Sequence, residues 1–278
     1  MNDDEYQILK RKIFDLIHID LNNYKTNQMM RRLNGFIPHD KFPNIRQYCD
    51  KLDRDPKELE KLRNFITINF SEFFRDQAPF QMLRNVILPQ LLKNSPRLNI
   101  WSAGCSDGQE PYSVSMMLKE LTPRVKHRIL ATDIDKENLN KAKAGGPYQN
   151  SDLKNLSQPV ISQCFKLTDE GYWLNEEIRD SVAFSQLDLT RDVFPQGFDL
   201  IMCRNVTIYF SNEAKSILNH KFLNSLRNEG ILFIGATETM LDANEIGFQR
   251  LYSCFFRKGL ISEPNGVRTP NSPVLSRR

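Results

Sequence analysis

The spacing of apolar residues divides the chain into two parts. From residue 1 to about 66, apolar side chains recur at helical intervals, beginning with Ile8, Leu9, Ile13, Phe14 and Ile17 and ending with Leu59, Leu62, Phe65 and Ile66. This period predicts amphipathic helices. Asp55-Pro56 supplies an N-cap and a first-turn proline for the last of them. We therefore expect a small all-helical bundle at this end.

From about residue 97, short apolar runs alternate with amphipathic stretches of helical length. The runs predict strands over 98–101, 128–132, 198–203 and 230–235, and the stretches predict helices over 110–121, 137–144 and 215–226. Such alternation predicts a parallel sheet with helices on both faces, an α/β fold. The last run, 248–257, predicts an antiparallel edge strand.

Two segments depart from the alternation. Strand-like residues flank Asp169-Glu-Gly171, which predicts a small antiparallel β excursion over about 160–185. Residues 259–278 are rich in Ser, Pro, Asn and Arg, so we expect a disordered tail. The predicted organisation is a helical domain with its linker over 1–80, an α/β domain over 81–258, and the tail.

Composition narrows the class of protein. The chain has 278 residues, of which 40% are hydrophobic, which is enough for a substantial core. Its five cysteines form no CxxC pair and its four histidines show no ligand spacing, so we expect free thiols in a reducing cytoplasm and no metal. The sequence contains no run of about 18 apolar residues, so we expect no membrane insertion. The acidic N-terminus does not resemble a secretory signal. A net charge of +4 does not by itself indicate nucleic-acid binding.

A glycine turn, Gly104-Cys-Ser-Asp-Gly108, stands between a predicted strand and a predicted helix. Such a turn brings backbone N–H groups close to a polar ligand. The turn lacks the GxGxxG pattern, which argues against a nicotinamide dehydrogenase. Glu110 at the start of the helix favours a cation over a pyrophosphate, and it suits the amino group of the methionine moiety of S-adenosylmethionine.

Two further acids stand where predicted strands end. Asp133 closes the second strand, where a carboxylate can accept hydrogen bonds from both ribose hydroxyls. Asp188 follows at the end of the next strand, where it can read the adenine amino group. Each acid alone also fits a helix cap. In this order, Glu110, Asp133 and Asp188 indicate an S-adenosylmethionine site.

Four segments together resemble one known family. Residues 69–75, 101–112, 131–135 and 203–210 resemble motifs of the bacterial chemotaxis receptor methyltransferases, the CheR family, and the resemblance runs from about Tyr24 to Arg257. It implies a Rossmann-like class I methyltransferase sheet with an N-terminal helical domain and a small antiparallel β insertion. It also implies methylation of glutamate side-chain carboxylates on the cytoplasmic helices of chemoreceptors, which yields methyl esters and S-adenosylhomocysteine in chemotactic adaptation.

The resemblance also assigns roles to residues. Arg75 is expected to orient the acceptor carboxylate, and Tyr209 to position that carboxylate or the methyl group. Arg75 also fits a structural ion pair, and Tyr209 also fits a core tyrosine with a satisfied hydroxyl. A basic set on the second helix is expected to dock the acidic receptor helices: Lys25, Arg31 and Arg32. Any one of these three charges also fits a solvated helix face. The residues implied for cofactor binding are Asn69, Ser71, Arg75, Gly104, Glu110, Asp133, Asp188, Leu189, Arg204 and Asn205.

The chain departs from the family pattern in two places. The usual Ser-Thr-Gly-Glu-Glu-Pro loop reads Ser106-Asp-Gly-Gln-Glu-Pro111, and we expect Asp107 to weaken or reorient cofactor binding. The β excursion looks shorter than in members that bind a receptor's C-terminal pentapeptide there. We therefore expect no pentapeptide tether.

Two other functions compete with this interpretation. A class I methyltransferase acting on nucleic-acid amines would usually carry an Asn/Asp-Pro-Pro-Tyr/Phe loop after its fourth strand, where this chain has Arg204-Asn-Val-Thr-Ile-Tyr209. A methyltransferase-like module would bind the cofactor, or another protein or nucleic-acid partner, without turnover. Asp107 is the residue that favours this second alternative.

Overall fold

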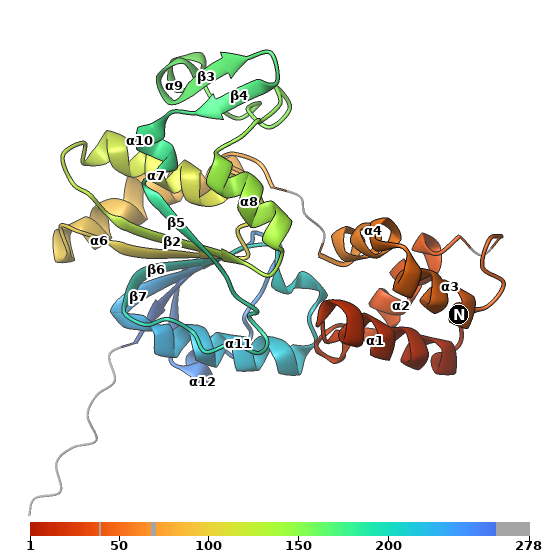
Figure 1. Cartoon of the computed structure of the whole chain (residues 1–278). Helices are drawn as coiled ribbons and strands as arrows, with labels where there is room; N and C mark the ends of the chain where they lie inside the picture. Colours follow the sequence, from red (N-terminus) through yellow and green to blue (C-terminus); the bar gives the residue numbers. More distant parts are fainter. Residues whose placement is uncertain (39, 68–70, 260–278) are drawn as a thin grey trace, which may run out of the picture.

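The N-terminal part of the computed structural model is all-helical, as expected. The structure describes residues 1–38, 40–67 and 71–259. Its first helices are α1 (Asp3–Ile17), α2 (Thr26–Phe36), α3 (Ile45–Arg54) and α4 (Pro56–Thr67), with a 3₁₀ turn, η1, at Leu21–Asn23 (Figure 1). Asn2 and Glu5 form a capping box at the start of α1. The Asp55 carboxylate accepts the Lys57 N–H, which confirms the predicted cap of α4. The helices enclose their own core, which includes Leu9, Leu33 and Leu62.

The second part is a seven-stranded sheet in the order β5-β2-β1-β6-β7-β9-β8. The five strands β5, β2, β1, β6 and β7 run parallel, and β9 and β8 are antiparallel. Helices α6, α7 and α8 lie on one face, and α11 and α12 on the other (Figure 1). The parallel strands are β1 (Asn99–Ala103), β2 (Arg128–Asp133), β5 (Val182–Gln186), β6 (Phe198–Cys203) and β7 (Leu226–Ile234), and the helices are α5 (Gln77–Met82), η2 (Leu83–Ile87), α6 (Leu88–Asn94), α7 (Gln109–Leu121), α8 (Lys136–Ala144), α11 (Asn212–Ser225) and α12 (Ala243–Ile246).

The predicted edge strand over 248–257 is wrong in detail. The segment is a hairpin of β8 (Phe248–Tyr252) and β9 (Phe255–Lys258), and β9 pairs with β7 while β8 forms the edge. The chain turns back at residues 253–254, and the Phe255 ring then stacks on Phe233 with centroids 4.3 Å apart. Aromatic packing against β7 therefore places the second half of the segment, and not the first, inside the sheet.

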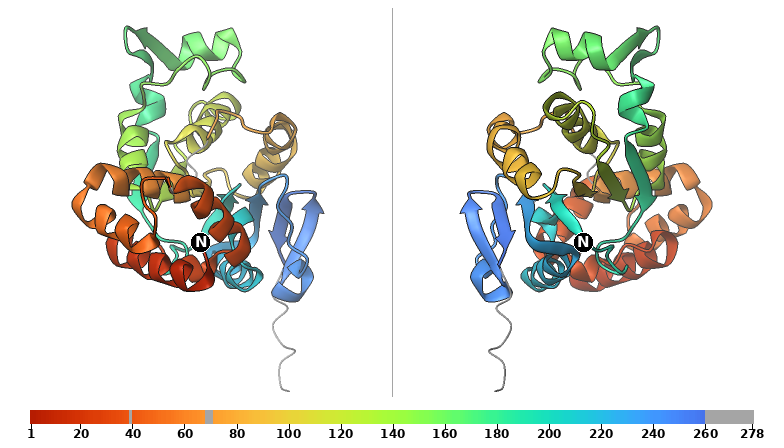
Figure 2. Two further views of the ribbon diagram at one scale, coloured as in Figure 1. Left: turned by 90° about the vertical axis from the view of Figure 1, so that its right-hand side faces the viewer. Right: turned by 90° about the vertical axis from the view of Figure 1, so that its left-hand side faces the viewer.

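The β excursion carries its own two-stranded antiparallel sheet, as expected. Helix α9 (Gln158–Cys164) leads into β3 (Phe165–Thr168), β4 (Gly171–Leu174) and α10 (Glu176–Arg179), and this unit projects from the body (Figure 2). Residues 182–186 already belong to β5 of the main sheet, so the excursion ends before residue 182. Phe73 and Phe80 pack into the larger core, which therefore begins before residue 80. The predicted tail lies outside the described residues from residue 260 onwards.

The two domains meet through a short backbone ladder. Tyr24 and Phe210 form an antiparallel bridge with ring centroids 4.9 Å apart. On either side of it, Lys25 N donates to Tyr209 O at 2.9 Å and Ser211 N donates to Asn23 O at 2.8 Å. The helical domain is thereby fixed at one end of the sheet, beside the carboxyl ends of its strands (Figure 2).

Candidate active site

A cavity of about 280 Å³ lies where the helical domain meets the sheet. The sheet side consists of residues at the carboxyl ends of β1, β2, β5 and β6, which is where open α/β sheets bind ligands. The helical domain supplies the opposite wall with Ile19, Asp20, Tyr24, Ile66 and Thr67. A smaller cavity of about 30 Å³ lies beside the larger one. Both cavities are lined by Arg75, Gly104, Ser106, Arg204 and Asn205, and the smaller one is lined in addition by Ser71, Glu72, Cys105 and Glu110.

The glycine turn lines both cavities, through Gly104 and Ser106. The N–H groups of Gly104 and Cys105 both donate to Thr132 O, at 2.7 and 3.0 Å, which holds the turn against the end of β2. Gly104 has φ +81°, and a Cβ there would lie 2.4 Å from Cγ2 of Val206. Only glycine therefore lets the segment after β6 pack directly on the turn.

Asp133 and Asp188 line the larger cavity, and each is already held by hydrogen bonds. Asp133 accepts the Ser106 N–H at 2.8 Å and the Asp135 N–H at 2.9 Å, while its burial raises the pKa of the carboxyl group. Asp188 accepts the Thr190 N–H and hydroxyl at 2.8 and 2.7 Å. Each carboxylate oxygen has two lone pairs, so both side chains keep acceptor capacity for hydroxyl and amino groups of a nucleoside.

Glu110 and Asn205 supply the acceptors around the smaller cavity. Glu110 accepts the Ser102 hydroxyl at 2.8 Å and Arg204 Nη1 at 3.3 Å, yet burial still raises the pKa of its carboxyl group. Oδ1 of Asn205 is buried and accepts no hydrogen bond from the residues that the structure describes. An ammonium group donates to such acceptors and relieves the cost of their burial. The amino group of a methionine moiety fits this end of the site.

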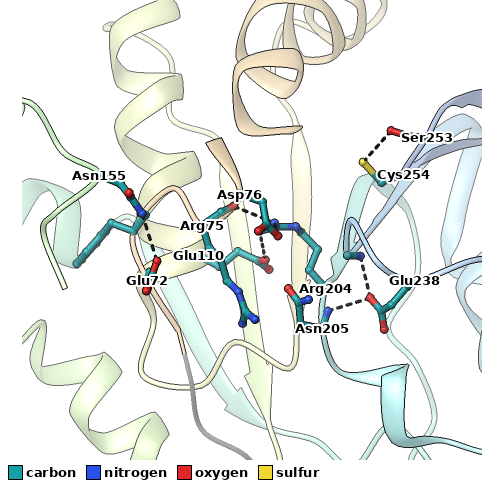
Figure 3. A network of polar contacts seen from close by, with 12 residues as sticks. Glu72, Arg75, Asp76, Glu110, Asn155, Arg204, Asn205, Glu238, Ser253 and Cys254 are labelled. Atoms are coloured by element: carbon teal, nitrogen blue, oxygen red, sulfur yellow. Dashed lines mark hydrogen bonds and ion pairs between the residues drawn. The ribbon is translucent and has the colours of Figure 1, made fainter. Parts of the chain in front are cut away.

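Arg204 is a buried cross-link between three segments. Its side chain is 2% exposed and donates to the Asp76 carboxylate and to Arg75 O, both at 2.9 Å, as well as to Glu110 (Figure 3). Its guanidinium lies 4.9 Å from the Phe80 ring centroid and 4.6 Å from that of Phe233. These contacts hold the linker, the start of α7 and the sheet in one arrangement around the smaller cavity.

Tyr209 lines the larger cavity and carries Arg32 on its ring. The Arg32 guanidinium lies 4.8 Å from the ring centroids of both Tyr209 and Phe65, and its Nη2 donates to Phe65 O at 2.7 Å. Lys25 Nζ donates to Ile208 O at 3.0 Å. Arg31, by contrast, is exposed on α2. Two of the three predicted docking residues therefore contact the segment that carries Tyr209.

Most of the residues predicted for the site line the two cavities together. Asn69 lies outside the described residues. Sequence reasoning missed Asp76, the wall residues of the helical domain, and Glu238, whose carboxylate accepts hydrogen bonds from Asn205 and Thr207. No sequence pattern identifies these residues. They lie in loops, or at helical positions that become part of the cavity only because the other domain packs against them. The predicted residues that line a cavity are Ser71, Arg75, Gly104, Glu110, Asp133, Asp188, Leu189, Arg204, Asn205 and Tyr209.

The fold and site together define the class of protein. A mostly parallel seven-stranded sheet, with buried or cavity-lining carboxylates at the carboxyl ends of its strands, is that of a class I S-adenosylmethionine-dependent methyltransferase. The chain belongs to the CheR methyltransferase family. The family model described as "CheR methyltransferase, SAM binding domain" matches residues 69–253, and "CheR methyltransferase, all-alpha domain" matches residues 4–67.

The chain is also similar to individual proteins that carry names. The chain is 36% identical over 255 residues to a chemotaxis protein methyltransferase of Listeria monocytogenes, which covers 91% of this chain and 97% of that protein. It is 34% identical over 251 residues to one of Borreliella burgdorferi, covering 85% and 88%. Among solved structures, the magnesium protoporphyrin IX methyltransferase of Synechocystis with bound S-adenosylmethionine is similar at a TM-score of 0.35 and 15% identity, over 65% of this chain and 77% of that one.

No group of three or more His, Cys, Asp or Glu side chains is arranged to hold a metal ion in the part of the chain that the structure describes. Over the same residues, no helix has both the length and the apolar character needed to span a bilayer.

Proposed function

We propose that this enzyme methylates glutamate side-chain carboxylates of chemoreceptors. The observation that carries the proposal is that Arg75 and Tyr209 line the same cavity as Asp133 and Asp188. A cationic side chain and a phenol thus stand beside the place where a cofactor would bind. The names of the relatives from Listeria and Borreliella, both chemotaxis protein methyltransferases, support a receptor as the substrate.

The chemistry requires alignment and no general base. Bound S-adenosylmethionine supplies a methyl group on a sulfonium, and an ionised carboxylate is already the nucleophile at neutral pH. Arg75 orients the acceptor carboxylate, and Tyr209 positions that carboxylate or the methyl group. Near-attack alignment of this kind contributes about 7–11 kcal/mol in favourable cases.

Receptor docking belongs to the basic face of α2. Receptor helices are acidic around their target glutamates, so positive charge steers and holds them. Arg31 is exposed and available for this contact, whereas Arg32 is partly buried between Phe65 and Tyr209. Within the basic set we therefore assign direct docking to Arg31 and Lys25, and we assign Arg32 to the boundary between the docking surface and the cavity.

The decisive experiment measures what kind of methyl group is transferred. The protein is incubated with methyl-labelled cofactor and receptor-containing membranes, and the product is treated with mild alkali. A glutamate methyl ester releases volatile methanol, whereas an N-methyl group does not. Base-stable label would reject the proposal in favour of amine methylation. Binding of S-adenosylhomocysteine in a calorimeter without any transfer would instead favour the methyltransferase-like binding module.

Arg75 provides an internal check of the mechanism. We expect Arg75→Ala to lose methyl transfer to the receptor. Arg75 also lines the smaller cavity, so cofactor affinity is measured in parallel. Normal transfer with normal cofactor affinity would reject its assigned role.

The β3–β4 excursion is the part of the chain at which a receptor's C-terminal pentapeptide would bind. We propose that the enzyme recognises receptors without a C-terminal pentapeptide. Removal of the last five residues of the receptor should then leave the rate of methyl-ester formation unchanged. A lower rate with the truncated receptor would reject this part of the proposal.

A further inference from the structure

Glu238 stands in the loop after β7, outside the set of residues assigned so far. It is 5% exposed, and its two carboxylate oxygens accept four hydrogen bonds. Oε2 accepts the N–H groups of Gly235 at 2.7 Å and Asn205 at 2.8 Å. Oε1 accepts the N–H of Thr207 at 2.9 Å and its hydroxyl at 2.7 Å. Figure 3 shows Glu238 beside Asn205, on the side of the network away from Glu110.

The four partners are all neutral donors. Among the described residues, no lysine or arginine forms an ion pair with Glu238. A carboxylate buried in this way carries a large desolvation cost, which several hydrogen bonds to the charged form offset. A neutral amide at this position would accept at one oxygen only and would set its NH₂ against N–H donors. The site is therefore specific for a carboxylate.

Three of the four hydrogen bonds hold one short segment, residues 204–209, and the fourth comes from Gly235, directly after β7. That segment carries Arg204, Asn205 and Tyr209 and ends in the 3₁₀ turn η3 (Thr207–Tyr209). Asn205 has φ +58°, a left-handed conformation that residues other than glycine rarely adopt, although asparagine adopts it more readily than most. The carboxylate binds the backbone N–H at that residue and again two residues later, which fixes this turn.

The surroundings are shaped for this contact. A Cβ at Gly235 would lie 2.6 Å from Oε2 of Glu238 and 2.9 Å from the backbone nitrogen of Asn205. A side chain at that position would push Glu238 away from the segment. On the far side, Val206 packs on Gly104 and the Tyr24–Phe210 bridge holds the end of the segment. Glu238 thus supplies the constraint from the sheet side.

We propose that Glu238 is a positioning residue that holds segment 204–209 so that Tyr209 and Asn205 face the cavity correctly. The role rests on the proposed function, because it is Tyr209 that positions the acceptor carboxylate or the methyl group. Glu238 acts through the segment and touches neither cofactor nor acceptor. Its loss should therefore lower kcat and cofactor affinity and change the KM for receptor less, because Arg31 docks from the exposed face of α2 and only Lys25 contacts the segment.

The experiment compares Glu238→Gln with Glu245→Gln, a change of an exposed glutamate on α12. Methyl-ester formation gives kcat and KM, and calorimetry gives the affinity for S-adenosylhomocysteine. Labelling all 8 tyrosines with 3-fluorotyrosine gives a ¹⁹F resonance for Tyr209, which Tyr209→Phe assigns. Thermal unfolding by circular dichroism reports the folded fraction. Thr207→Val is the milder second variant, since it removes one of the four donors and keeps the side-chain shape.

We expect Glu238→Gln to lower kcat by about 10- to 100-fold, the scale of a misplacement of order 1 Å, with a smaller change in the KM for receptor. The Tyr209 resonance should shift or broaden while the protein remains folded. Thr207→Val should act in the same direction, less strongly and non-additively with Glu238→Gln. Glu245→Gln should match the wild type.

Two results would overturn the inference. One is an unchanged kcat and an unchanged Tyr209 resonance in Glu238→Gln. The other is a loss of activity that only follows the unfolded fraction, with a native Tyr209 resonance in the folded part. If the wild type formed no methyl ester at all, the proposed function would fail instead, and the Tyr209 resonance would still decide the role of Glu238.

Discussion

Gln109 donates a hydrogen bond from its amide nitrogen to Oδ2 of Asp107, 3.1 Å away. The two positions at which this loop departs from the family pattern are thus partners. Burial raises the pKa of the Asp107 carboxyl group, while the Gln109 amide opposes that rise. The backbone carbonyl of Asp107 accepts the Tyr148 hydroxyl at 3.0 Å. In the described structure Asp107 lines neither cavity, so we expect any effect of Asp107 on cofactor binding to pass through the shape of the loop.

The pairing predicts that Gln109→Glu alone is harmful. A glutamate would set a second carboxylate against Asp107 at a position that is 1% exposed. We expect a loss of about 1–3 kcal/mol in the free energy of unfolding, measured by urea denaturation, because a hydrogen bond is lost and like charges meet. The loss should be larger at alkaline than at acidic pH, where one carboxyl group takes up a proton.

The matched control restores both family residues together. Asp107→Thr combined with Gln109→Glu removes the like-charge pair and should recover most of the stability that Gln109→Glu loses. Equal stabilities of Gln109→Glu and the double variant would contradict the coupling.

Arg31 and Arg32 are neighbours in sequence with different predicted effects. Arg31→Glu should raise the KM for receptor and leave stability and cofactor affinity unchanged, because the side chain is exposed. Arg32→Ala should lower stability by about 1–2 kcal/mol, because it removes two cation–π contacts from a partly buried site. It should also lower kcat, since one of those contacts is with Tyr209. Steady-state kinetics and denaturant unfolding of the two variants test this contrast, and identical kinetic profiles would refute it.

Arg204 is predicted to matter for the fold as much as for the site. Arg204→Ala leaves the buried Glu110 without its ion-pair partner, and loss of one member of a buried pair costs about 3–5 kcal/mol. Unfolding in guanidinium chloride measures this loss in the free energy of unfolding. Asp76→Asn is the milder comparison, because the Asp76 side chain is 37% exposed and its amide oxygen still accepts a hydrogen bond. A loss in Arg204→Ala no larger than that in Asp76→Asn would reject the cross-linking role.

Cofactor binding should depend on pH. Burial raises the pKa of Asp133 and Glu110 above the ordinary values of 3.8 and 4.5. In the ligand-free protein, their contribution to folding is therefore fully present below the ordinary pKa values and is lost as the pH rises through the raised values. If the cofactor donates hydrogen bonds to these carboxylates as proposed, its binding should favour their charged forms, lower both pKa values and release protons.

We therefore expect the affinity for S-adenosylhomocysteine to fall as the pH is lowered from about 8 to about 5, towards the range in which carboxyl groups titrate. Calorimetry in buffers of different ionisation enthalpy counts the protons released. Asp133→Asn should reduce that release. A binding constant that stays level across this range in the wild type would contradict the prediction.

The parts of the fold that a regular pattern encodes were predictable. Strand β6 has the predicted bounds, 198–203, because six consecutive buried residues leave a clear apolar run. The place of Gly104, Asp133 and Asp188 beside the cavity was predictable because each stands where such a run ends. The hairpin over 248–258 was not, since the turn at 253–254 carries neither glycine nor proline.

Contacts between segments that lie far apart in the sequence limit how much of the site can be predicted from the sequence. Arg32 lies on a helix whose sequence period marks it as solvent-facing, and only the second domain covers it with Tyr209. Glu238 meets Thr207 across 31 residues of chain, from a loop without any recurring pattern. Asp76 likewise meets Arg204 across 128 residues. A single sequence shows which side chains follow a strand, but not which loops come together beside it.

The bridge between Tyr24 and Phe210 joins the two domains through their backbones, although each has its own hydrophobic core. Residues 71–258 on their own would keep the sheet but lose the cavity wall formed by Ile19, Tyr24 and Ile66. The backbone groups at Tyr209 and Ser211 would also lose their partners at Lys25 and Asn23. The helical bundle is thus part of the cavity itself, and we expect an exchange of the bundle between relatives to change the cavity along with the exposed face of α2.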